Sequence, residues 1–355
     1  MTNEELQSFL GSADMTVVDA MEKIDANSCG ILFITDKDRR LLGALTDGNV
    51  RRWLIRTGSL KALVSEAMNP TPKYLRADQI AMAQKLMAEF HVTCLPVVSS
   101  GNRIIDLIFN TKRPAGPGIP NTDALADVPI VIMAGGKGTR LYPYTKILPK
   151  PLIPIGDIPI SEHIINRFRR FGCRDFRLVV NYQKNMIKAY YNEIDKDYNI
   201  TYIDEDVPLG TGGGLSLLKG QIPSTFILSN CDILINDDFV RIFRYHKERG
   251  NQITMICSLK NYRIPYGVVH MSEGGAIESM EEKPTVSFFT NTGCYIVEPE
   301  VLDSIPTNTE VGFPEVIENL RRDGAKVGVY PISETAWMDM GQMDGLEEMR
   351  EKLVQ

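Results

Sequence analysis

Glycines and cations gather in one short stretch of this chain. The apolar run 129–133 ends in the segment Ala134-Gly135-Gly136-Lys137-Gly138-Thr139-Arg140, which predicts a buried strand that opens into a tight loop. Glycine has no Cβ atom, so the backbone of such a loop can approach a ligand and turn its N–H groups toward it. Lys137, Arg140 and Lys150 add positive charge around the loop. A structural turn needs neither feature, and the two together predict a polyphosphate site.

Two familiar phosphate-binding patterns fail on spacing. A Walker A loop needs Ser or Thr after its Gly-Lys pair, and Gly136-Lys137 is followed by Gly138. The dinucleotide fingerprint G-x-G-x-x-G, started at Gly136, would end at Leu141 instead of glycine. The loop is therefore of a third kind, and dinucleotide-dependent redox chemistry is disfavoured.

A carboxylate follows another buried strand. The apolar run 224–229 leads through Asn230 and Cys231 into Asp232. Mg²⁺ beside phosphates takes one or two carboxylates, and its other ligands are water and phosphate oxygens. Asp232 is therefore a candidate metal ligand, with a loop-capping role as the structural alternative.

Alternating strands and helices must position these residues. Ligands of a mostly parallel, doubly wound sheet bind at the carboxyl ends of its strands, where the chemistry-bearing residues of this chain are predicted to lie. We therefore expect a single cleft. The expected helices are 161–171, 184–194 and 211–218, and the expected strands are 175–181, 199–203 and 224–229.

The run AGGKGTRL with a downstream PKP resembles the signature of the sugar-1-phosphate nucleotidyltransferase family. The resemblance extends from Val128 to Gly341 and includes a second glycine cluster, Pro208-Leu209-Gly210-Thr211-Gly212-Gly213-Gly214. It implies a Rossmann-like α/β domain of the GT-A type. By this resemblance the nucleotide contacts Ala134, Gly135, Gly136, Gly138, Thr139, Arg140, Leu209, Gly210, Thr211 and Gly212.

The same resemblance implies a sugar site and a magnesium site. The family's Y-G-V, E-K-P and N-x-G segments imply that the sugar phosphate contacts Gly267, Glu282, Lys283, Asn291 and Thr292. Its W-x-D-x-G motif makes Asp339 the second ligand of Mg²⁺, beside Asp232. Arg140, Lys150 and Lys283 are then the catalytic cations.

The implied reaction joins a nucleoside monophosphate to a sugar 1-phosphate and releases pyrophosphate. GTP and glucosamine 1-phosphate are the favoured substrates, because a similar architecture occurs in guanylyltransferases of bacterial nonulosonic-acid pathways, which supply surface glycans. Mannose-1-phosphate guanylyl transfer, and uridylyl or thymidylyl transfer, are alternatives. A catalytically silent sensor of nucleotides or nucleotide sugars is an alternative of another class.

The N-terminal third contains an internal duplication. Strand, turn and strand over 30–45 recur about 63 residues later, where Leu32–Thr35 aligns with Leu95–Val98 and Gly43–Asp47 with Asp106–Asn110. Two copies of a unit that cannot close its own core are expected to pack together. The segment GALTDGNVRR resembles the CBS-domain motif. This implies a tandem CBS (Bateman) module that binds an adenine-nucleotide effector through Thr46 and Asp47, and a role in packing alone is the alternative.

Composition divides the chain into three segments and argues against several classes of protein. Residues 1–113 form the predicted regulatory module, 114–127 a Pro- and Gly-containing linker, and 128–355 the catalytic domain. A net charge of −6 argues against a nucleic-acid binder. The six scattered cysteines and the polar, acidic N-terminus predict a reduced cytoplasmic protein without a membrane segment. We also expect a homo-oligomer, formed through the CBS pair or the catalytic domain.

Overall fold

The computed structural model describes residues 2–27, 29–60, 62–90, 92–110 and 121–353. The chain forms two compact units. The first contains Met1–Gly118 and Leu259–Phe288, and the second contains Ile119–Ser258 and Phe289–Gln355. Half of the predicted linker, residues 114–120, lies outside the described residues. The predicted domain boundaries stay a prediction, and the structure adds that the segment Leu259–Phe288 clusters with the N-terminal part of the chain.

A seven-stranded sheet forms the centre of the second unit, in the order β11-β10-β7-β12-β17-β14-β18. Strands β10, β11, β7 and β12 pair in parallel, β14 pairs with β18 in parallel, and β17 runs antiparallel to β12. The predicted mostly parallel α/β sheet is therefore confirmed. The strands are β7 Ile130–Met133, β10 Asp175–Val180, β11 Asn199–Asp204, β12 Phe226–Asn230, β14 Ile253–Arg263, β17 Thr285–Val297 and β18 Val327–Ile332.

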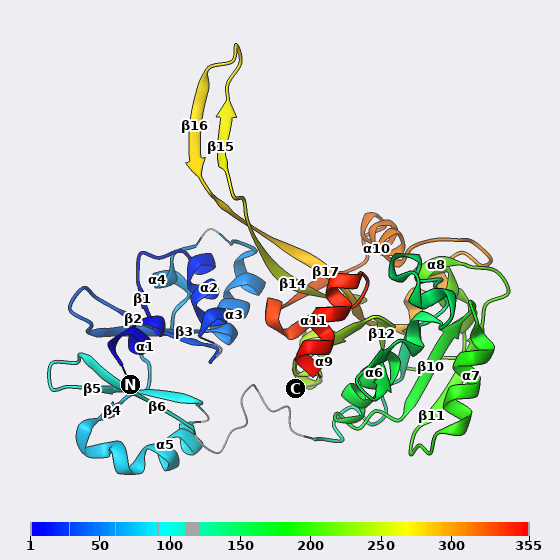
Figure 1. Ribbon diagram of the computed structural model, residues 1–355, viewed down its shortest axis with the longest axis horizontal. Coiled ribbons are helices and arrows are strands. Elements are labelled where there is room, and N and C mark those ends of the chain that lie inside the picture. Colours follow the sequence, from blue (N-terminus) through cyan, green and yellow to red (C-terminus); the bar gives the residue numbers. More distant parts are fainter. Residues whose placement is uncertain (1, 28, 61, 91, 111–120, 354–355) are drawn as a thin grey trace. The chain divides into compact units, whose positions relative to one another are not determined.

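Helices lie against this sheet (Figure 1). Side chains of α10 pack into a core with strand residues, as Val316 and Ile317 do with Leu228 and Tyr295. The helices are α6 Ile160–Arg169, α7 Lys184–Glu193, α8 Gly210–Gly213, α9 Phe239–Arg249, α10 Phe313–Arg322 and α11 Met343–Leu353. Two short pairs complete the unit: β8 Pro154–Ile155 with β9 Ile158–Pro159, and β13 Ile233–Ile235 with β19 Trp337–Asp339.

Strand β7 explains where the first glycine loop lies. All four of its residues are buried, and it pairs in parallel with β10 on one side and β12 on the other. A parallel strand covered on both faces is apolar throughout, which is the pattern of Ile130–Met133. The loop that follows it therefore opens at the carboxyl edge of the sheet, beside the ends of β10 and β12.

The helix expected over 211–218 has a different form. A single α-helical turn, α8, covers Gly210–Gly213 and continues as the 3₁₀ helix η5, Gly214–Leu218. Glycine is a poor helix former, and this segment has four in five positions. The close approach of another loop also requires glycine, because a Cβ atom at Gly213 would lie 2.1 Å from the carbonyl oxygen of Thr309. The expected helix is therefore replaced by one α-helical turn and a 3₁₀ helix.

The first unit contains two matching three-stranded sheets. In the first sheet, β1 pairs in parallel with β2, and β2 pairs antiparallel with β3. The second sheet repeats this arrangement, because β4 pairs in parallel with β5 and β5 pairs antiparallel with β6. The strands are β1 Leu10–Ser12, β2 Ile31–Thr35, β3 Leu41–Thr46, β4 Leu75–Arg76, β5 Cys94–Val98 and β6 Ile104–Phe109. The helices are α1 Asn3–Ser8, α2 Val17–Ala26, α3 Asp47–Thr57, α4 Val64–Ala67 and α5 Ala83–Phe90.

The two halves of this duplication share one core. Phe33 and Leu41 of the first half cluster with Val98 and Ile104 of the second. Backbone hydrogen bonds also join the halves, such as that from Leu41 N to the carbonyl oxygen of Asn102, at 2.9 Å. The predicted packing of the two copies is confirmed.

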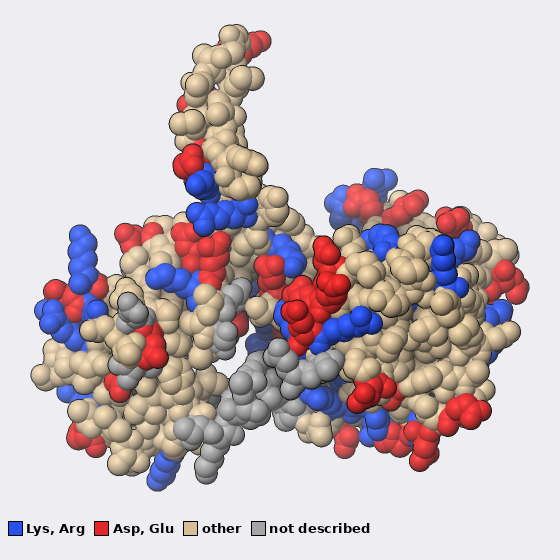
Figure 2. Space-filling view, in the orientation of Figure 1, with Lys and Arg blue, Asp and Glu red and all other residues tan. Residues whose placement is uncertain are grey.

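A two-stranded ribbon also belongs to the first unit. It consists of β15 (Gly267–Met271) and β16 (Ile277–Glu282), which pair antiparallel. Its apolar side chains Val269, Met271, Ile277 and Met280 are exposed, and most of the ribbon surface visible in Figure 2 carries no charge. At its base, Leu259 is buried in the core formed by α2, α3 and α4. The ribbon is thus anchored to the N-terminal module.

All six cysteines are free and five of them are buried, as their spacing predicted. No helix among the described residues has the length and apolar character to cross a bilayer.

A buried histidine makes the stability of the second unit sensitive to acid. His246 is fully buried in α9, with Nδ1 2.8 Å from Thr254 Oγ1 and Nε2 3.1 Å from Glu298 Oε1. Burial lowers the pKa of His246, and the bond to Glu298 only partly opposes this. The unfolded chain therefore binds a proton at this histidine at a higher pH than the native chain does. Its contribution to stability is full above the unfolded pKa of about 6.5 and is lost as the pH falls below it.

We expect His246→Gln to reduce the loss of melting temperature between pH 7.5 and pH 5.5. Melting curves of the wild type and the variant at both pH values measure it. His270→Gln, at an exposed histidine of the ribbon, is the matched control and should melt like the wild type. An unchanged acid sensitivity in His246→Gln would show that other groups carry it.

Candidate active site

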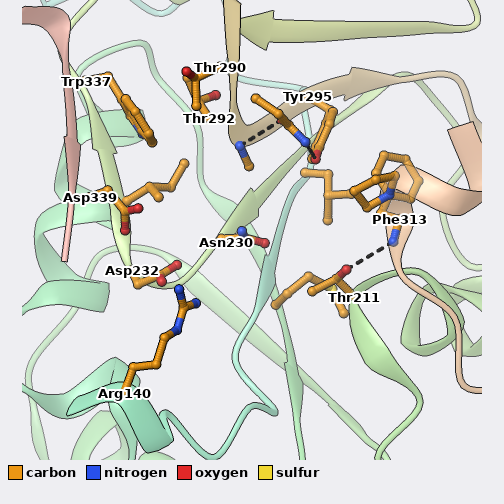
Figure 3. A pocket seen from close by; sticks show the side chains of 16 residues that line it. Arg140, Thr211, Asn230, Asp232, Thr290, Thr292, Tyr295, Phe313, Trp337 and Asp339 are labelled. Carbon is orange, nitrogen blue, oxygen red and sulfur yellow. Dashed lines mark hydrogen bonds between the residues drawn. The ribbon is translucent and has the colours of Figure 1, made fainter. Parts of the chain in front are cut away.

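A pocket of about 280 Å³ opens at the carboxyl edge of the sheet in the second unit (Figure 3). Side chains from the ends of β7 and β12, from the body of β17, from β13 and β19, from α8 and from the start of α10 converge on it, together with Arg140. The predicted cleft is therefore present. It is lined by Met133, Arg140, Thr211, Leu228, Asn230, Asp232, Ile233, Thr290, Asn291, Thr292, Gly293, Tyr295, Phe313, Pro314, Trp337 and Asp339.

Strand pairing brings two carboxylates together on one side of the pocket. Antiparallel pairing of β13 with β19 places Ile233 opposite Asp339, and Met340 N donates to the carbonyl oxygen of Asp232 at 2.9 Å. A Cβ atom at Gly341 would lie 2.9 Å from Asp339 Oδ1 and 3.4 Å from Asp232 Oδ2. Both carboxylates therefore point to the same space, which the missing side chain of Gly341 leaves open.

The electrostatics of this side of the pocket favour a cation between the carboxylates. Burial and the neighbouring Asp232 raise the pKa of Asp339, while Gly341 N–H, Lys150 and Arg140 oppose the rise. Lys150 Nζ donates to Asp232 Oδ2. Figure 3 shows the Arg140 side chain reaching toward Asp232. Like charges held close together in a partly buried site are stabilised by a counter-ion.

Two carboxylates fit a magnesium site that leaves its other positions to water and phosphate oxygens. Among the described residues, no group of three or more His, Cys, Asp or Glu side chains could hold a metal by itself. Asp232 and Asp339 would hold such an ion.

Buried hydroxyl groups position Lys150. Ser161 Oγ donates to the carbonyl oxygen of Pro151 at 2.7 Å, and Tyr191 OH donates to Ser161 Oγ at 2.7 Å. Ser161 and Tyr191 are fully buried in α6 and α7. The two helices thereby fix the backbone next to Lys150, whose ammonium group meets Asp232.

The first glycine loop makes a tight turn at Gly138, where the backbone conformation requires glycine. Its φ of +64° is one that other residues rarely adopt, and a Cβ atom there would lie 2.9 Å from Thr145 Cγ2. Thr145 Oγ1 donates to the carbonyl oxygen of Gly138 at 2.7 Å. The turn delivers Thr139 and Arg140 to the short 3₁₀ helix η2, Thr139–Leu141, from which Arg140 enters the pocket.

The second glycine loop is fastened to the start of α10. Gly212 N and Gly213 N both donate to the carbonyl oxygen of Val311, at 2.8 and 3.1 Å. Thr211 Oγ1 accepts from Phe313 N at 3.0 Å, drawn as a dashed line in Figure 3. Thr211 thus caps α10 and lines the pocket at the same time.

The model of the nucleotidyl transferase family matches residues 130–355 of this chain. That range is well over half of the chain and contains every residue that lines the pocket. The chain belongs to the nucleotidyl transferase family. A CBS domain model also matches residues 12–56, the first half of the duplicated module. Enzymes of the nucleotidyl transferase family generally use a divalent metal, which is consistent with the carboxylate pair.

Curated relatives of this nucleotidyl transferase include mannose-1-phosphate guanylyltransferases. The catalytic subunit beta from Drosophila pseudoobscura pseudoobscura is 34% identical over 237 residues, which is 63% of this chain and 62% of that protein. The protein from Mycobacterium tuberculosis is 31% identical over 226 residues, 61% of this chain and 62% of that protein. The chain thus spans about three fifths of the length of the curated relatives it matches.

A solved structure shares the fold. HddC from Yersinia pseudotuberculosis superposes with a TM-score of 0.51 and is 21% identical, covering 63% of this chain and 99% of that one. HddC has also been solved in complex with GMP-PN. At this level of identity the likeness shows the fold alone.

The structure separates the predicted nucleotide contacts into two groups. Arg140 and Thr211 line the pocket. The others lie in the two glycine loops but are not among its lining residues, and their contact with a nucleotide stays a prediction. These are Ala134, Gly135, Gly136, Gly138, Thr139, Leu209, Gly210 and Gly212.

The predicted sugar contacts also divide. Asn291 and Thr292 line the pocket, but Thr292 Oγ1 donates to the carbonyl oxygen of Ile256 at 2.6 Å and the residue is buried. Asn291 Nδ2 donates to Tyr295 OH at 2.7 Å. Gly267, Glu282 and Lys283 belong instead to the ribbon and its end in the first unit. Their part in the sugar site, and the catalytic role of Lys283, stay predictions.

Several lining residues escaped sequence reasoning: Asn230, Thr290, Tyr295, Phe313, Pro314 and Trp337. A signal existed for two of them. Asn230 precedes Asp232 by two residues at the end of β12, and Trp337 stands in the same motif as Asp339. Phe313 and Pro314 had no local signal, because only the docking of the second glycine loop brings α10 to the pocket.

In the N-terminal module, Thr46 has a structural role. Thr46 Oγ1 accepts from Asn49 N at 3.2 Å, which caps the first turn of α3. Asp47 begins that helix. The structural alternative therefore has direct support, and effector binding by Thr46 and Asp47 stays a prediction.

Proposed function

We propose that this chain transfers a nucleoside monophosphate, preferably GMP from GTP, to a hexose or amino-hexose 1-phosphate and releases pyrophosphate. One observation carries the proposal: two carboxylates, Asp232 and Asp339, converge beside Arg140 and Lys150 at the carboxyl edge of the sheet. Chemistry on a triphosphate needs two carboxylates that can hold a cation, next to side chains with fixed positive charge. The family match and the names of the curated relatives support guanylyl transfer to a sugar 1-phosphate.

In the proposed reaction, a phosphate oxygen of the sugar 1-phosphate attacks the α-phosphorus of the nucleoside triphosphate. The bond from that phosphorus to the bridging oxygen of the β-phosphate breaks, and pyrophosphate leaves with the electron pair. The attacking phosphate is already anionic at neutral pH, so the protein needs no nucleophile. It needs in-line positioning and charge stabilisation.

The predicted site residues have distinct tasks in this scheme. Arg140 and the loop N–H groups hold the β- and γ-phosphates, and Lys150 compensates charge at the α-phosphate. Asp232 and Asp339 hold Mg²⁺, which supplies positive charge to the phosphates when it is bound. Glu282 and Lys283, named from the E-K-P motif, are the proposed contacts of the sugar and its phosphate. An adenine nucleotide at the CBS module is the proposed effector.

A matrix of the four nucleoside triphosphates against several sugar 1-phosphates, with Mg²⁺, tests the proposal by pyrophosphate release. Glucosamine 1-phosphate and mannose 1-phosphate are the first acceptors to compare, since the sequence favoured the former and the curated relatives are named for the latter. We expect the highest rate with GTP, and no release after chelation of the metal. Repeating the best pair with AMP or ATP tests the effector. Tight nucleotide binding without turnover would instead support a silent sensor.

A further inference from the structure

The ribbon formed by β15 and β16 has one apolar face. Residues directly opposite each other in an antiparallel pair lie on the same face. Val269 pairs with Met280, and the next pair on that face is Met271 with Ile277. A register shift creates this second pair, because an unshifted register would set Met271 opposite Glu278. All four apolar side chains therefore share one face of the ribbon.

This apolar face is uncovered in the single chain. The exposed fractions of its four side chains lie between 48% and 71%. Among the described residues, no third strand pairs with β15 or β16. A two-stranded ribbon is only marginally stable in water by itself, and a contiguous exposed apolar face marks an interaction site. The ribbon is therefore suited to docking on another surface.

The formal charges of the ribbon are all negative. The segment 267–282 contains four glutamates and neither Lys nor Arg. All four glutamates are exposed: Glu273, Glu278, Glu281 and Glu282. Complementary charge favours the right partner, and like charge disfavours a wrong one. A surface that receives the ribbon must therefore combine apolar side chains with positive charge.

A second exposed surface of the chain is apolar. It consists of residues 142–147, which follow the first glycine loop, and is called here the 142–147 surface. The exposed fractions of Tyr142, Tyr144 and Ile147 are 43%, 38% and 74%. The ammonium group of Lys146 lies 5.4 Å from the centre of the Tyr142 ring, so charge and apolar area alternate on this surface.

The 142–147 surface is also positively charged and adjoins the pocket. Lys137, Arg140 and Lys146 are exposed, and the segment 137–147 contains neither Asp nor Glu. Arg140 lines the pocket, and Thr145, which is buried beneath the surface, donates to the carbonyl oxygen of Gly138 in the glycine loop. A segment docked on this surface would therefore lie at the mouth of the pocket.

We propose that the ribbon of a second copy of this chain docks with its apolar face on the 142–147 surface. Each copy offers one ribbon and one such surface, and both are exposed in the single chain. A twofold-symmetric pair therefore covers both ribbons and both surfaces in one closed assembly. Docking also brings Glu282 and Lys283 to the pocket of the other copy, and this consequence rests on the proposed function.

Charge reversal tests the two surfaces against each other. The ribbon variant combines Glu278→Lys with Glu281→Lys, and the surface variant combines Lys137→Glu with Lys146→Glu. In sedimentation equilibrium, the wild type should associate, and each full-length variant alone should associate about tenfold more weakly or worse. An equal mixture should return to within about threefold of the wild type, since both contacts of a mixed pair again join opposite charges. A monomeric wild type, or a mixture as weak as its components, would overturn the proposal.

Polar substitutions test the apolar contact on both sides. Met280→Ser in the ribbon and Ile147→Ser in the 142–147 surface should each weaken association about tenfold or more, because each removes a large apolar group from the interface. His270→Ser is the matched control, since His270 pairs with Ser279 on the other face of the ribbon. Melting curves confirm that each variant is folded. Association as tight as that of the wild type in both Met280→Ser and Ile147→Ser would contradict the docking.

Cross-linking decides which copy supplies the ribbon. Met280→Cys and Ile147→Cys chains are mixed and treated with a short bismaleimide, and the treated wild type controls for the six native cysteines. We expect a two-chain product in the mixture that the wild type does not form. If a chain with both substitutions links only within itself, and the mixture gives no two-chain product, the ribbon docks on its own chain and the proposal is wrong.

Activity of mixed pairs tests the consequence for the pocket. Lys283→Ala and Asp232→Asn are each expected to be nearly inactive alone. If the ribbon acts on the other copy, an equal mixture should recover about a quarter of the wild-type rate, because half of the pairs are mixed and each has one intact site. No recovery beside an active wild type would contradict the supply of Lys283 by a second copy. An inactive wild type would refute the proposed function, and sedimentation and cross-linking would still decide the docking.

Discussion

Asp232→Asn is expected to lower the rate of pyrophosphate release at saturating substrates by about a hundredfold or more, while the chain stays folded. Removing one group that stabilises developing charge in a buried site typically costs about 10²–10³ in kcat. Asp232 is largely buried, and its carboxylate shares one open space with Asp339. The amide of asparagine has the same shape but carries no charge, so the site loses half of its anionic metal ligands.

The Asp232→Asn measurement combines initial rates with a metal titration. The variant should need more Mg²⁺ for half-maximal activity, because the ion must be held by Asp339 and the substrate phosphates alone. Asp303→Asn, at an exposed carboxylate of the second unit, should keep the wild-type rate and metal requirement. A rate near that of the wild type in Asp232→Asn would remove this residue from the proposed metal site.

Arg140→Ala is expected to cause a loss of similar size, about a hundredfold or more in turnover. Arg140 is exposed at the mouth of the pocket, in a loop that Gly138 and Thr145 already fix. Its removal therefore costs little stability and acts on the phosphates that it is proposed to hold. Because a guanidinium group presents several donors in one plane, Arg140→Lys should recover only part of the rate.

The Arg140 experiment compares rates and melting temperatures of the two variants with those of Arg170→Ala. Arg170 is an exposed arginine outside the pocket, and its loss should leave the rate unchanged. Near-wild-type pyrophosphate release from Arg140→Ala would overturn its assignment to the triphosphate. A large fall in melting temperature would point to a structural role of the arginine.

Local sequence signals were sufficient for much of the fold. The buried strand Ile130–Met133 was predictable because a parallel strand covered on both faces must be apolar throughout. The duplication in the N-terminal third was visible because both copies repeat the same strand spacing. The helix expected over 211–218 was wrong in form, since its glycines serve the close approach of the 309–313 loop.

The residues of the site were harder to group. Asp232 and Asp339 were named from separate motifs, but only the pairing of β13 with β19 brings their carboxylates to one space. Gly135 was interpreted as room for a ligand, and the structure shows the carboxyl group of Glu205 behind it. No local pattern marks Glu205, Ser161 or Tyr191, because their significance lies in contacts with distant segments.

The sequence by itself determined which chemistry this protein is equipped for: glycine loops, fixed cations and carboxylates at strand ends are properties of residue type and order. Tertiary structure alone decided which of them meet. Phe313 comes to the pocket because Thr211 caps its helix, and both glycine loops contact Glu205 because β7, β10 and β11 lie side by side. The physical reason is that strand pairing and helix docking join segments far apart in the chain, and such long-range contacts leave no periodic signal in the local sequence.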